Sequence, residues 1–116
     1  MKVLIANKND IINAISMQEC IDVMEETLTL LAEGDAYNPL RGSMHIPNKN
    51  GLLGTMPGHI NKHSVFGIKA VSVYPDNAHI GLDSHQGSVT LFDATNGVPL
   101  AIMDAGQITA IRTAAV

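Results

Sequence analysis

Residues 65–74 are Val65-Phe66-Gly67-Ile68-Lys69-Ala70-Val71-Ser72-Val73-Tyr74. From about residue 40 onward the apolar residues recur with a period of two, which is the period of a β-strand. The turn-forming residues Pro75-Asp76-Asn77 follow directly. The stretch therefore predicts a long β-strand, and alternation along it places Lys69 on the same face as Val71.

Further strands are predicted on both sides of this one. The period of two continues through four other segments, which are residues 41–47, 52–56, 84–94 and 98–103. Asn50-Gly51 and Asn96-Gly97 lie between pairs of these segments. They predict short hairpin loops, because both residues of such a turn must adopt positive φ. Hairpins join antiparallel neighbours, so we expect a mixed, mostly antiparallel sheet.

Helices are predicted at the two ends of the chain. Residues 2–6 suit a short strand, and residues 11–15 suit a helical turn. The clearest helix begins after Ser16, which stands three residues before Glu19 at the spacing of a capping box, and it ends at Gly34. Its apolar residues recur at helical spacing; they are Ile21, Met24, Leu28 and Leu31. Residues 107–116 predict the start of a further helix, which ends without a glycine, a proline or a polar tail.

The order of these elements indicates the fold class. One N-terminal helix, about five strands and a helix start are typical of an α+β fold and not of alternating βαβ units. We expect a single domain over residues 1–116. No Gly-x-Gly-x-x-Gly motif occurs, and the nearest match, at residues 51–58, has the wrong spacing and does not open a helix. The sequence thus predicts an α+β domain without a complete Rossmann domain.

Composition narrows the class of protein. Hydrophobic residues make up 46% of the 116 residues and aromatic residues only 3%, so we expect an aliphatic core. The formal net charge of −4 argues against a nucleic-acid partner, since no basic stretch is available for a phosphate backbone. Cys20 is the only cysteine, which excludes an intrachain disulfide, and we expect it to be an inert core residue. Without a signal peptide or an apolar run of roughly 20 residues, we expect a cytoplasmic protein with no membrane partner.

Three cations stand in segments that are otherwise uncharged: Arg41, Lys69 and Arg112. A lysine in the middle of an apolar strand is unfavourable to bury without an anionic partner, so Lys69 is either on a solvated or edge face or part of a ligand site. Arg112 either lays its stem on apolar surface with its head in water, or presents a planar fork to a carboxylate or phosphate. Arg41 by itself has the character of a surface arginine. Three such cations in one pocket, however, would suit an α-carboxylate.

Five histidines raise the question of a metal site. His59 and His63 have the spacing of neighbours on a helix, but a proline and a glycine precede them and no acidic cluster lies nearby. We therefore expect a loop at this place and no metal ion. His85 is interpreted as a pocket or sheet-edge residue. Asp93 and Asp104 stand at strand ends, where turn capping explains them. Since no pair of carboxylates suits acid–base chemistry, the sequence predicts no catalytic residue in this chain.

Three segments carry a family resemblance. They are Gly67-Ile68-Lys69-Ala70-Val71-Ser72-Val73-Tyr74-Pro75, then Gly81-Leu82-Asp83-Ser84-His85-Gln86-Gly87-Ser88-Val89-Thr90-Leu91-Phe92-Asp93-Ala94, and then the stretch from Thr95-Asn96-Gly97-Val98-Pro99-Leu100-Ala101 through Ile108-Thr109-Ala110-Ile111-Arg112-Thr113-Ala114-Ala115. In this order they resemble the glycine-x-lysine strand, the next strand, and the signature leading into the second domain of the ornithine cyclodeaminase/mu-crystallin family. The resemblance covers nearly the whole chain, and residues 81–116 are its most specific part.

The resemblance implies roles for four residues. It implies that Arg41 and Lys69 hold the carboxylate of a small amino acid or imino acid. Arg112 would lie between this substrate and a NAD or NADP cofactor, and Ser84 takes the place of a cofactor-contacting threonine or serine. The sheet would pair with its twin and close a barrel in a homodimer. A complete enzyme of this kind would oxidise an amine to an imine with NAD and then cyclise or release ammonia, or would reduce an imine.

The chain departs from the family pattern in two places. Gly54 stands two residues before Met56-Pro57, where ornithine-specific members have a glutamate, which weakens an ornithine assignment. The family's nucleotide-binding domain, with its catalytic aspartate, would follow residue 116. The chain is therefore interpreted as the N-terminal substrate-binding and dimerisation domain of a longer enzyme, inactive and without bound cofactor on its own. The alternatives are a free-standing, non-catalytic dimeric module that binds a small carboxylate or amino acid, and a structural protein whose sheet oligomerises.

Overall fold

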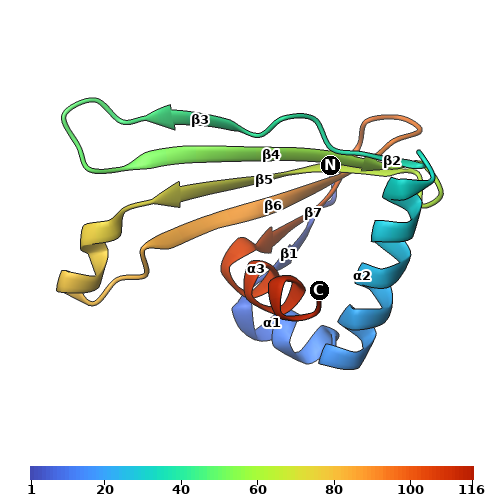
Figure 1. Cartoon of the computed structure of the whole chain (residues 1–116), viewed down its shortest axis with the longest axis horizontal. Coiled ribbons are helices and arrows are strands. Elements are labelled where there is room, and N and C mark those ends of the chain that lie inside the picture. The colour runs from blue at the N-terminus through green and yellow to red at the C-terminus, as the bar shows by residue number, and fades with distance from the viewer.

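A seven-stranded sheet organises the chain, and its centre is formed by the long strands that the sequence predicts (Figure 1). The computed structural model describes all of residues 1–116. Its elements are β1 (Leu4–Ala6), α1 (Lys8–Ala14), α2 (Met17–Ala32), β2 (Ala36–Tyr37), β3 (Gly42–His45), β4 (Leu52–Ile60), β5 (Val65–Val73), the 3-10 helix η1 (Pro75–Ile80), β6 (His85–Asp93), β7 (Pro99–Asp104) and α3 (Ala105–Ala114). The strand order is β1-β7-β6-β5-β4-β2, and β3 also pairs with β4. Only β1 and β7 are parallel, which confirms the α+β class and the mixed, mostly antiparallel sheet.

Strand β5 is the long strand predicted at residues 65–74, and it has a partner on each side along its whole length. The register places Lys69 between Met56 of β4 and Val89 of β6. Because side chains alternate along a strand, Lys69 and its next same-face neighbour Val71 lie on one face of the sheet, and Phe66 lies on the other. Lys69 is therefore fixed near the middle of the sheet.

Helix α2 begins and ends where the sequence predicts. The Ser16 Oγ accepts a hydrogen bond from the Glu19 amide at 3.1 Å, and Glu19 Oε1 accepts one from the Ser16 amide at 3.2 Å, so the capping box is present. Gly34 follows the helix with a φ of 83°, a conformation that glycine adopts without strain. No helix of the chain has the length and hydropathy needed to cross a bilayer.

The N-terminal end holds more helix than predicted. Residues 11–15 were expected to form a single turn, but α1 begins at Lys8. A second capping box explains the earlier start, since Asn7 Oδ1 accepts from the Asp10 amide at 3.0 Å and Asp10 Oδ2 accepts from the Asn7 amide at 2.9 Å. The spacing from Asn7 to Asp10 is an Asx variant of the Ser-x-x-Glu pattern and gives a weaker sequence signal.

Neither Asn-Gly pair forms the predicted turn with both residues at positive φ. In the β6–β7 loop only Gly97 has positive φ, at 77°, and its amide donates to the Asp93 carbonyl at 2.8 Å. In the β3–β4 loop the positive φ, at 63°, belongs to Asn48. Gly51 is required there for another reason, because a Cβ at this position would overlap the ring of Tyr74.

Strand β4 continues past the predicted end at residue 56 and passes through Pro57. Proline has no amide hydrogen and is tolerated where a strand edge is unpaired. Strand β3 pairs with residues 52–55 of β4 and β2 pairs with residues 59–60, so the outer edge of β4 has no strand partner at Pro57. The loop predicted around His59 is therefore wrong, and His59 is a strand residue whose Nδ1 lies 2.9 Å from the Val65 carbonyl oxygen.

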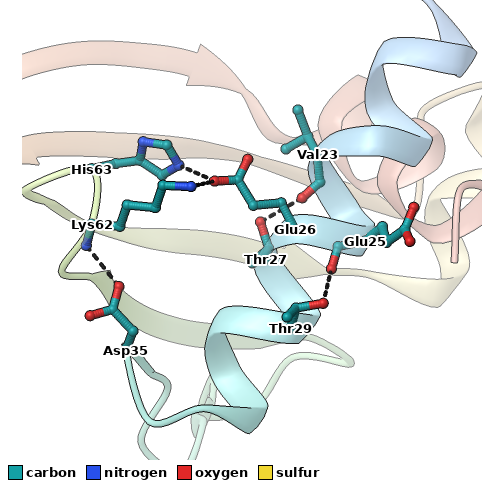
Figure 2. A network of polar contacts seen from close by, with 8 residues as sticks. All are labelled: Val23, Glu25, Glu26, Thr27, Thr29, Asp35, Lys62 and His63. Carbon is teal, nitrogen blue, oxygen red and sulfur yellow. Dashed lines mark hydrogen bonds and ion pairs between the residues drawn. The ribbon is translucent and has the colours of Figure 1, made fainter.

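At one end of the sheet, a group of charged residues ties α2 to the turn between β4 and β5 (Figure 2). Glu26 Oε1 accepts a hydrogen bond from Lys62 Nζ at 2.7 Å and lies 3.1 Å from His63 Nε2. Asp35 Oδ2 accepts from the Lys62 amide at 2.9 Å. We call Glu26, Asp35, Lys62 and His63 the clasp. The hydrogen bond and charge of Lys62 lower the pKa of Glu26, and those of Glu26 raise the pKa of Lys62.

The three α-helices lie on one side of the sheet, below it in Figure 1, and leave the opposite face uncovered. On this open sheet face, Phe66 and Phe92 are register partners whose rings stack with centroids 5.0 Å apart. Phe66 and Ile102 each remain 38% exposed, and only eight of the 116 residues are buried. A single sheet with helices on one side therefore does not enclose a full core.

Candidate functional site

A groove of about 1010 Å³ lies between α3 and the helix-side face of the sheet. Strands β4, β5 and β6 contribute its floor, and α3 contributes one wall. The four residues that the sequence singles out all line it: Arg41 just before β3, Lys69 in β5, Ser84 just before β6, and Arg112 in the last turn of α3. Segments up to 71 residue positions apart thus meet at one site. We call it the cation groove, defined by Arg41, Lys69 and Arg112.

Lys69 is the most enclosed of the three cations. Its Nζ donates a hydrogen bond to Thr109 Oγ1 of α3 at 3.2 Å. Burial lowers the pKa of Lys69 below its ordinary value, and the positive charges of Arg112 and then Arg41 lower it further. Each of these three effects disfavours the ammonium form. The groove therefore holds a concentration of positive charge that is unfavourable in the absence of an anion.

No carboxylate of the chain pairs with these cations. The ion pairs of the chain are those of Glu26 with Lys62 and His63, and both belong to the clasp. Asp104 also lines the groove, but its Oδ1 accepts from the Gln107 amide at 2.8 Å as the N-cap of α3. The predicted capping role of Asp104 is confirmed, as is that of Asp93, whose Oδ1 accepts from the Thr95 amide at 2.7 Å.

Arg112 combines the two environments that the sequence left open. It lines the cation groove, and it also lines an apolar hollow of about 400 Å³ between the helices, together with Ile11, Met24 and Ile108. A long arginine stem covers apolar surface while its guanidinium stays at a polar edge. The position near the C-terminal end of α3 also favours a cation, since the carbonyl groups there carry partial negative charge.

Ser84 lies directly before the first residue of β6. Its Oγ is 3.0 Å from His85 Nδ1, and its carbonyl accepts from the Tyr74 amide at 2.8 Å. His85 lines the groove as well, in keeping with its interpretation as a pocket or edge residue. A hydroxyl paired with an imidazole can donate to or accept from a polar group in the groove.

The sequence did not reveal two further residues of this site, Thr109 and Gly87. Thr109 is the partner of Lys69, but a single threonine on a helix gives no signal by itself. Gly87 lines the groove where β6 approaches β5 closely, because a Cβ on it would lie 2.8 Å from the Cα of Val71 and overlap the backbone of residue 70. Gly54 also lines the groove, and a Cβ there would meet only ordinary contacts of 3.7–4.0 Å.

The remaining histidines belong to other structures. His59 and His63 do not share a helix, since His59 lies in β4 and His63 lies in the turn that follows it. His63 contacts Glu26 in the clasp. No group of three or more histidine, cysteine, aspartate or glutamate side chains is arranged to hold a metal ion.

Comparison with known proteins identifies relatives along the whole chain. The model of the ornithine cyclodeaminase/mu-crystallin family matches residues 1–116. The ketimine reductase mu-crystallin of Mus musculus is 39% identical over 84 residues, which are 72% of this chain and 27% of that protein. The structure of Thermococcus litoralis Δ1-pyrroline-2-carboxylate reductase in complex with NADH and L-proline superposes with a TM-score of 0.93 at 36% identity, over 97% of this chain and 35% of the other.

A third relative is an archaeal alanine dehydrogenase dimer with bound NAD, which superposes with a TM-score of 0.91 at 33% identity over 99% of this chain and 35% of the other. This chain therefore spans about a third of the length of the relatives that it matches. The match of the family model to every residue, the shared fold and the order of the resembling segments agree: the chain belongs to the ornithine cyclodeaminase/mu-crystallin family.

Proposed function

We propose that this chain provides the substrate-binding and dimerisation part of an NAD-dependent oxidoreductase that acts on a small amino acid or imino acid. The observation that carries the proposal is the cation groove, in which three positive charges have no anionic partner within the chain. The carboxylate of such a substrate supplies the missing negative charge. The related reductase bound to NADH and L-proline supports this class of ligand.

Arg41 and Lys69 are proposed to bind the substrate carboxylate. A guanidinium offers two parallel donors to a carboxylate, and an ammonium offers a compact positive charge. We propose that Arg112, which lines the groove from α3, lies between substrate and cofactor. Since the carboxylate and the reacting carbon are adjacent atoms in an α-amino or α-imino acid, fixing the carboxylate also fixes the position of that carbon.

The fit of this chain to a nicotinamide cofactor is partial. Ser84 and Arg112 offer a hydroxyl and a cation at the groove, and we propose that they contact one end of the cofactor. The chain has no Gly-x-Gly-x-x-Gly loop to hold the pyrophosphate. A bound nicotinamide would give or accept the hydride, whereas the residues of this chain bind and orient the substrate. We expect the 116-residue chain to show no turnover by itself.

The substrate's side chain is proposed to be small or apolar. Gly54, Met56 and Val71 line the groove near Lys69 and bring no charge to it. The carboxylates that line the groove, Asp83 and Asp104, lie just before β6 and at the end of β7. A basic side chain such as that of ornithine would therefore meet the positive charge of Lys69 beside Gly54, Met56 and Val71. The uncharged lining beside Lys69 favours cyclic or short-chain amino and imino acids over ornithine.

The open sheet face is proposed to form a homodimer. Phe66, Phe92 and Ile102 would be covered by the same face of a second copy, because apolar faces of this kind mark interaction surfaces and two-fold pairing is the commonest solution. The dimeric alanine dehydrogenase supports this proposal. Light scattering should give a dimer mass at micromolar concentration, and Phe66→Glu should give a monomer. A monomeric wild-type chain would contradict the proposal.

Calorimetric titration tests the binding function directly. L-Proline and L-alanine should bind the purified chain in the absence of cofactor, and L-ornithine should bind more weakly than either. NADH should show little binding. Tight NADH binding would contradict the partial cofactor site, and a chain that binds no amino acid would contradict the substrate site.

An alternative function is that of a free-standing, non-catalytic module that binds a small carboxylate or amino acid. It uses the same groove and predicts the same amino-acid titrations. The relationship to ketimine and pyrroline-carboxylate reductases favours the oxidoreductase.

A further inference from the structure

Lys69 must present its ammonium group to a ligand from the middle of a sheet, and the structure shows how the group is held. The stem lies between Met56 and Val89, the register partners on the two neighbouring strands. At the tip, Nζ donates to Thr109 Oγ1 at 3.2 Å. A lysine ammonium has three donors, so this bond leaves two of them for a ligand.

A hydroxyl suits this position better than a carboxylate would. An acidic partner at hydrogen-bond distance would neutralise Lys69 and would compete with an anionic ligand, as Glu26 occupies Lys62 in the clasp. The neutral Thr109 hydroxyl fixes the direction of the ammonium and leaves its charge intact. The lone pair of the hydroxyl oxygen also favours the charged form of Lys69, against the burial and the two arginines that disfavour it.

The same bond joins two parts of the groove. Thr109 lies three residues before Arg112, and residues at this spacing are neighbours on one helix face. Lys69 belongs to β5. The bond from Lys69 to Thr109 therefore ties the helix that carries Arg112 to the lysine, and so links the positions of two of the cations.

We propose that Thr109 is a positioning residue, whose hydroxyl holds the Lys69 ammonium in the direction in which it binds the carboxylate of the ligand. This proposal rests on the proposed substrate site and deepens it. The residue itself is not required to touch the ligand.

The test uses three variants of the 116-residue chain with L-proline as the probe. Thr109→Val removes the hydroxyl at nearly constant volume and should weaken L-proline binding by about five- to tenfold, in line with the typical net contribution of one hydrogen bond. Thr109→Ser keeps the hydroxyl and should restore binding to within about twofold. Thr29→Val makes the same exchange on the exposed surface of α2, outside the groove; it is the matched control and should leave the affinity unchanged.

A second measurement separates positioning from packing. NMR titration of the lysine side chains should show a lower pKa for Lys69 in Thr109→Val than in the wild type, because the ammonium has lost its acceptor. As the pH rises and Lys69 loses its proton, the affinity of Thr109→Val for L-proline should therefore begin to fall at a lower pH than that of the wild type. If Thr109 only packs α3, Thr109→Val should lower the melting temperature and leave the pKa of Lys69 unchanged. Thr109→Val and Thr109→Ser should then bind L-proline with the same affinity.

The outcomes also separate this proposal from the substrate site on which it rests. If the wild type does not bind L-proline, the substrate site is contradicted, while a changed Lys69 pKa in Thr109→Val would still support Thr109 as the residue that holds the ammonium. If Thr109→Val binds L-proline as tightly as the wild type and Lys69 keeps its pKa, the positioning role is overturned.

Discussion

The clasp and the cation groove are two clusters of positive charge in one chain, and they differ in whether the chain supplies the opposite charge. In the clasp, Lys62 lies 2.7 Å from a Glu26 oxygen, and its pKa is raised. In the groove, Lys69 has only a hydroxyl as partner, and burial and two arginines lower its pKa. The same residue type is thus stabilised as a cation at one place and destabilised at the other.

The comparison indicates what each cluster is for. A cation with its carboxylate already in place contributes to holding α2 against the β4–β5 turn. Cations gathered without a carboxylate work against the fold, and their unmet attraction is available to a ligand from outside. Variants that exchange properties between the two clusters therefore test this difference.

The largest effect is expected from Lys69→Met, which removes the central cation and keeps an apolar stem. L-Proline affinity should fall by at least about 30-fold, since a charged hydrogen-bond partner of the carboxylate is lost. The melting temperature should rise, because a partly buried cation beside two arginines is no longer desolvated. Calorimetric titration and thermal melts check both. Lys49→Met, in the exposed β3–β4 loop, is the control and should change neither the L-proline affinity nor the melting temperature. A Lys69→Met variant that binds L-proline normally would contradict the role of the groove as a carboxylate site.

A smaller effect is expected from Gly54→Glu, which gives the groove a carboxylate of its own. Gly54 pairs with Val71, the same-face neighbour of Lys69, and a Cβ fits there. Pairing with the new carboxylate should weaken L-proline binding by about tenfold and raise the pKa of Lys69, making it resemble Lys62. Gly54→Gln has nearly the same shape without the charge. If both variants weaken binding equally, space and not charge is responsible.

Glu26→Gln breaks the clasp and should leave the groove intact. The melting temperature should fall by a few degrees at most, because exposed ion pairs contribute little. The pKa of Lys62 should return toward its ordinary value. L-Proline affinity should stay at the wild-type value, and a clear loss of affinity would show that the two clusters are coupled.

The smallest effect concerns acid stability. Because the folded-state pKa of Glu26 is lowered, the stability contributed by this carboxylate is present above its ordinary pKa and is lost as the pH falls through the lowered value. Denaturant titrations should therefore show the difference between wild type and Glu26→Gln shrinking with acidification below the ordinary glutamate pKa. A difference that grows toward low pH would have the wrong sign.

Much of the fold was accessible from the sequence because it depends on local patterns. Period-two segments predict the long strands, and the spacing of Ser16 and Glu19 predicts the start of α2. Sequence patterns did not predict the elements that are too short to show a period, or a strand that continues through a proline because of how its neighbours pair. Strand β2 has only two residues, too few for a period, and β4 runs through Pro57 because its outer edge is unpaired there.

The candidate site likewise has residues that the sequence predicts and features that only the folded chain shows. Arg41, Lys69 and Arg112 could be singled out because each is a lone charge in an otherwise uncharged segment, and Ser84 through the family resemblance. That all four line one groove depends on the register of β4, β5 and β6 and on the position of α3. Thr109 could not be predicted, because its importance lies in a contact with a residue 40 positions away.

The most direct test of the cation groove compares L-proline with L-prolinamide, which has the same ring but no carboxylate. In NMR titrations of the chain, L-proline should shift the side-chain signals of Lys69, Arg41 and Arg112, and L-prolinamide should leave them in place. If both compounds shift these signals equally, or if neither does, the three cations do not form a carboxylate site.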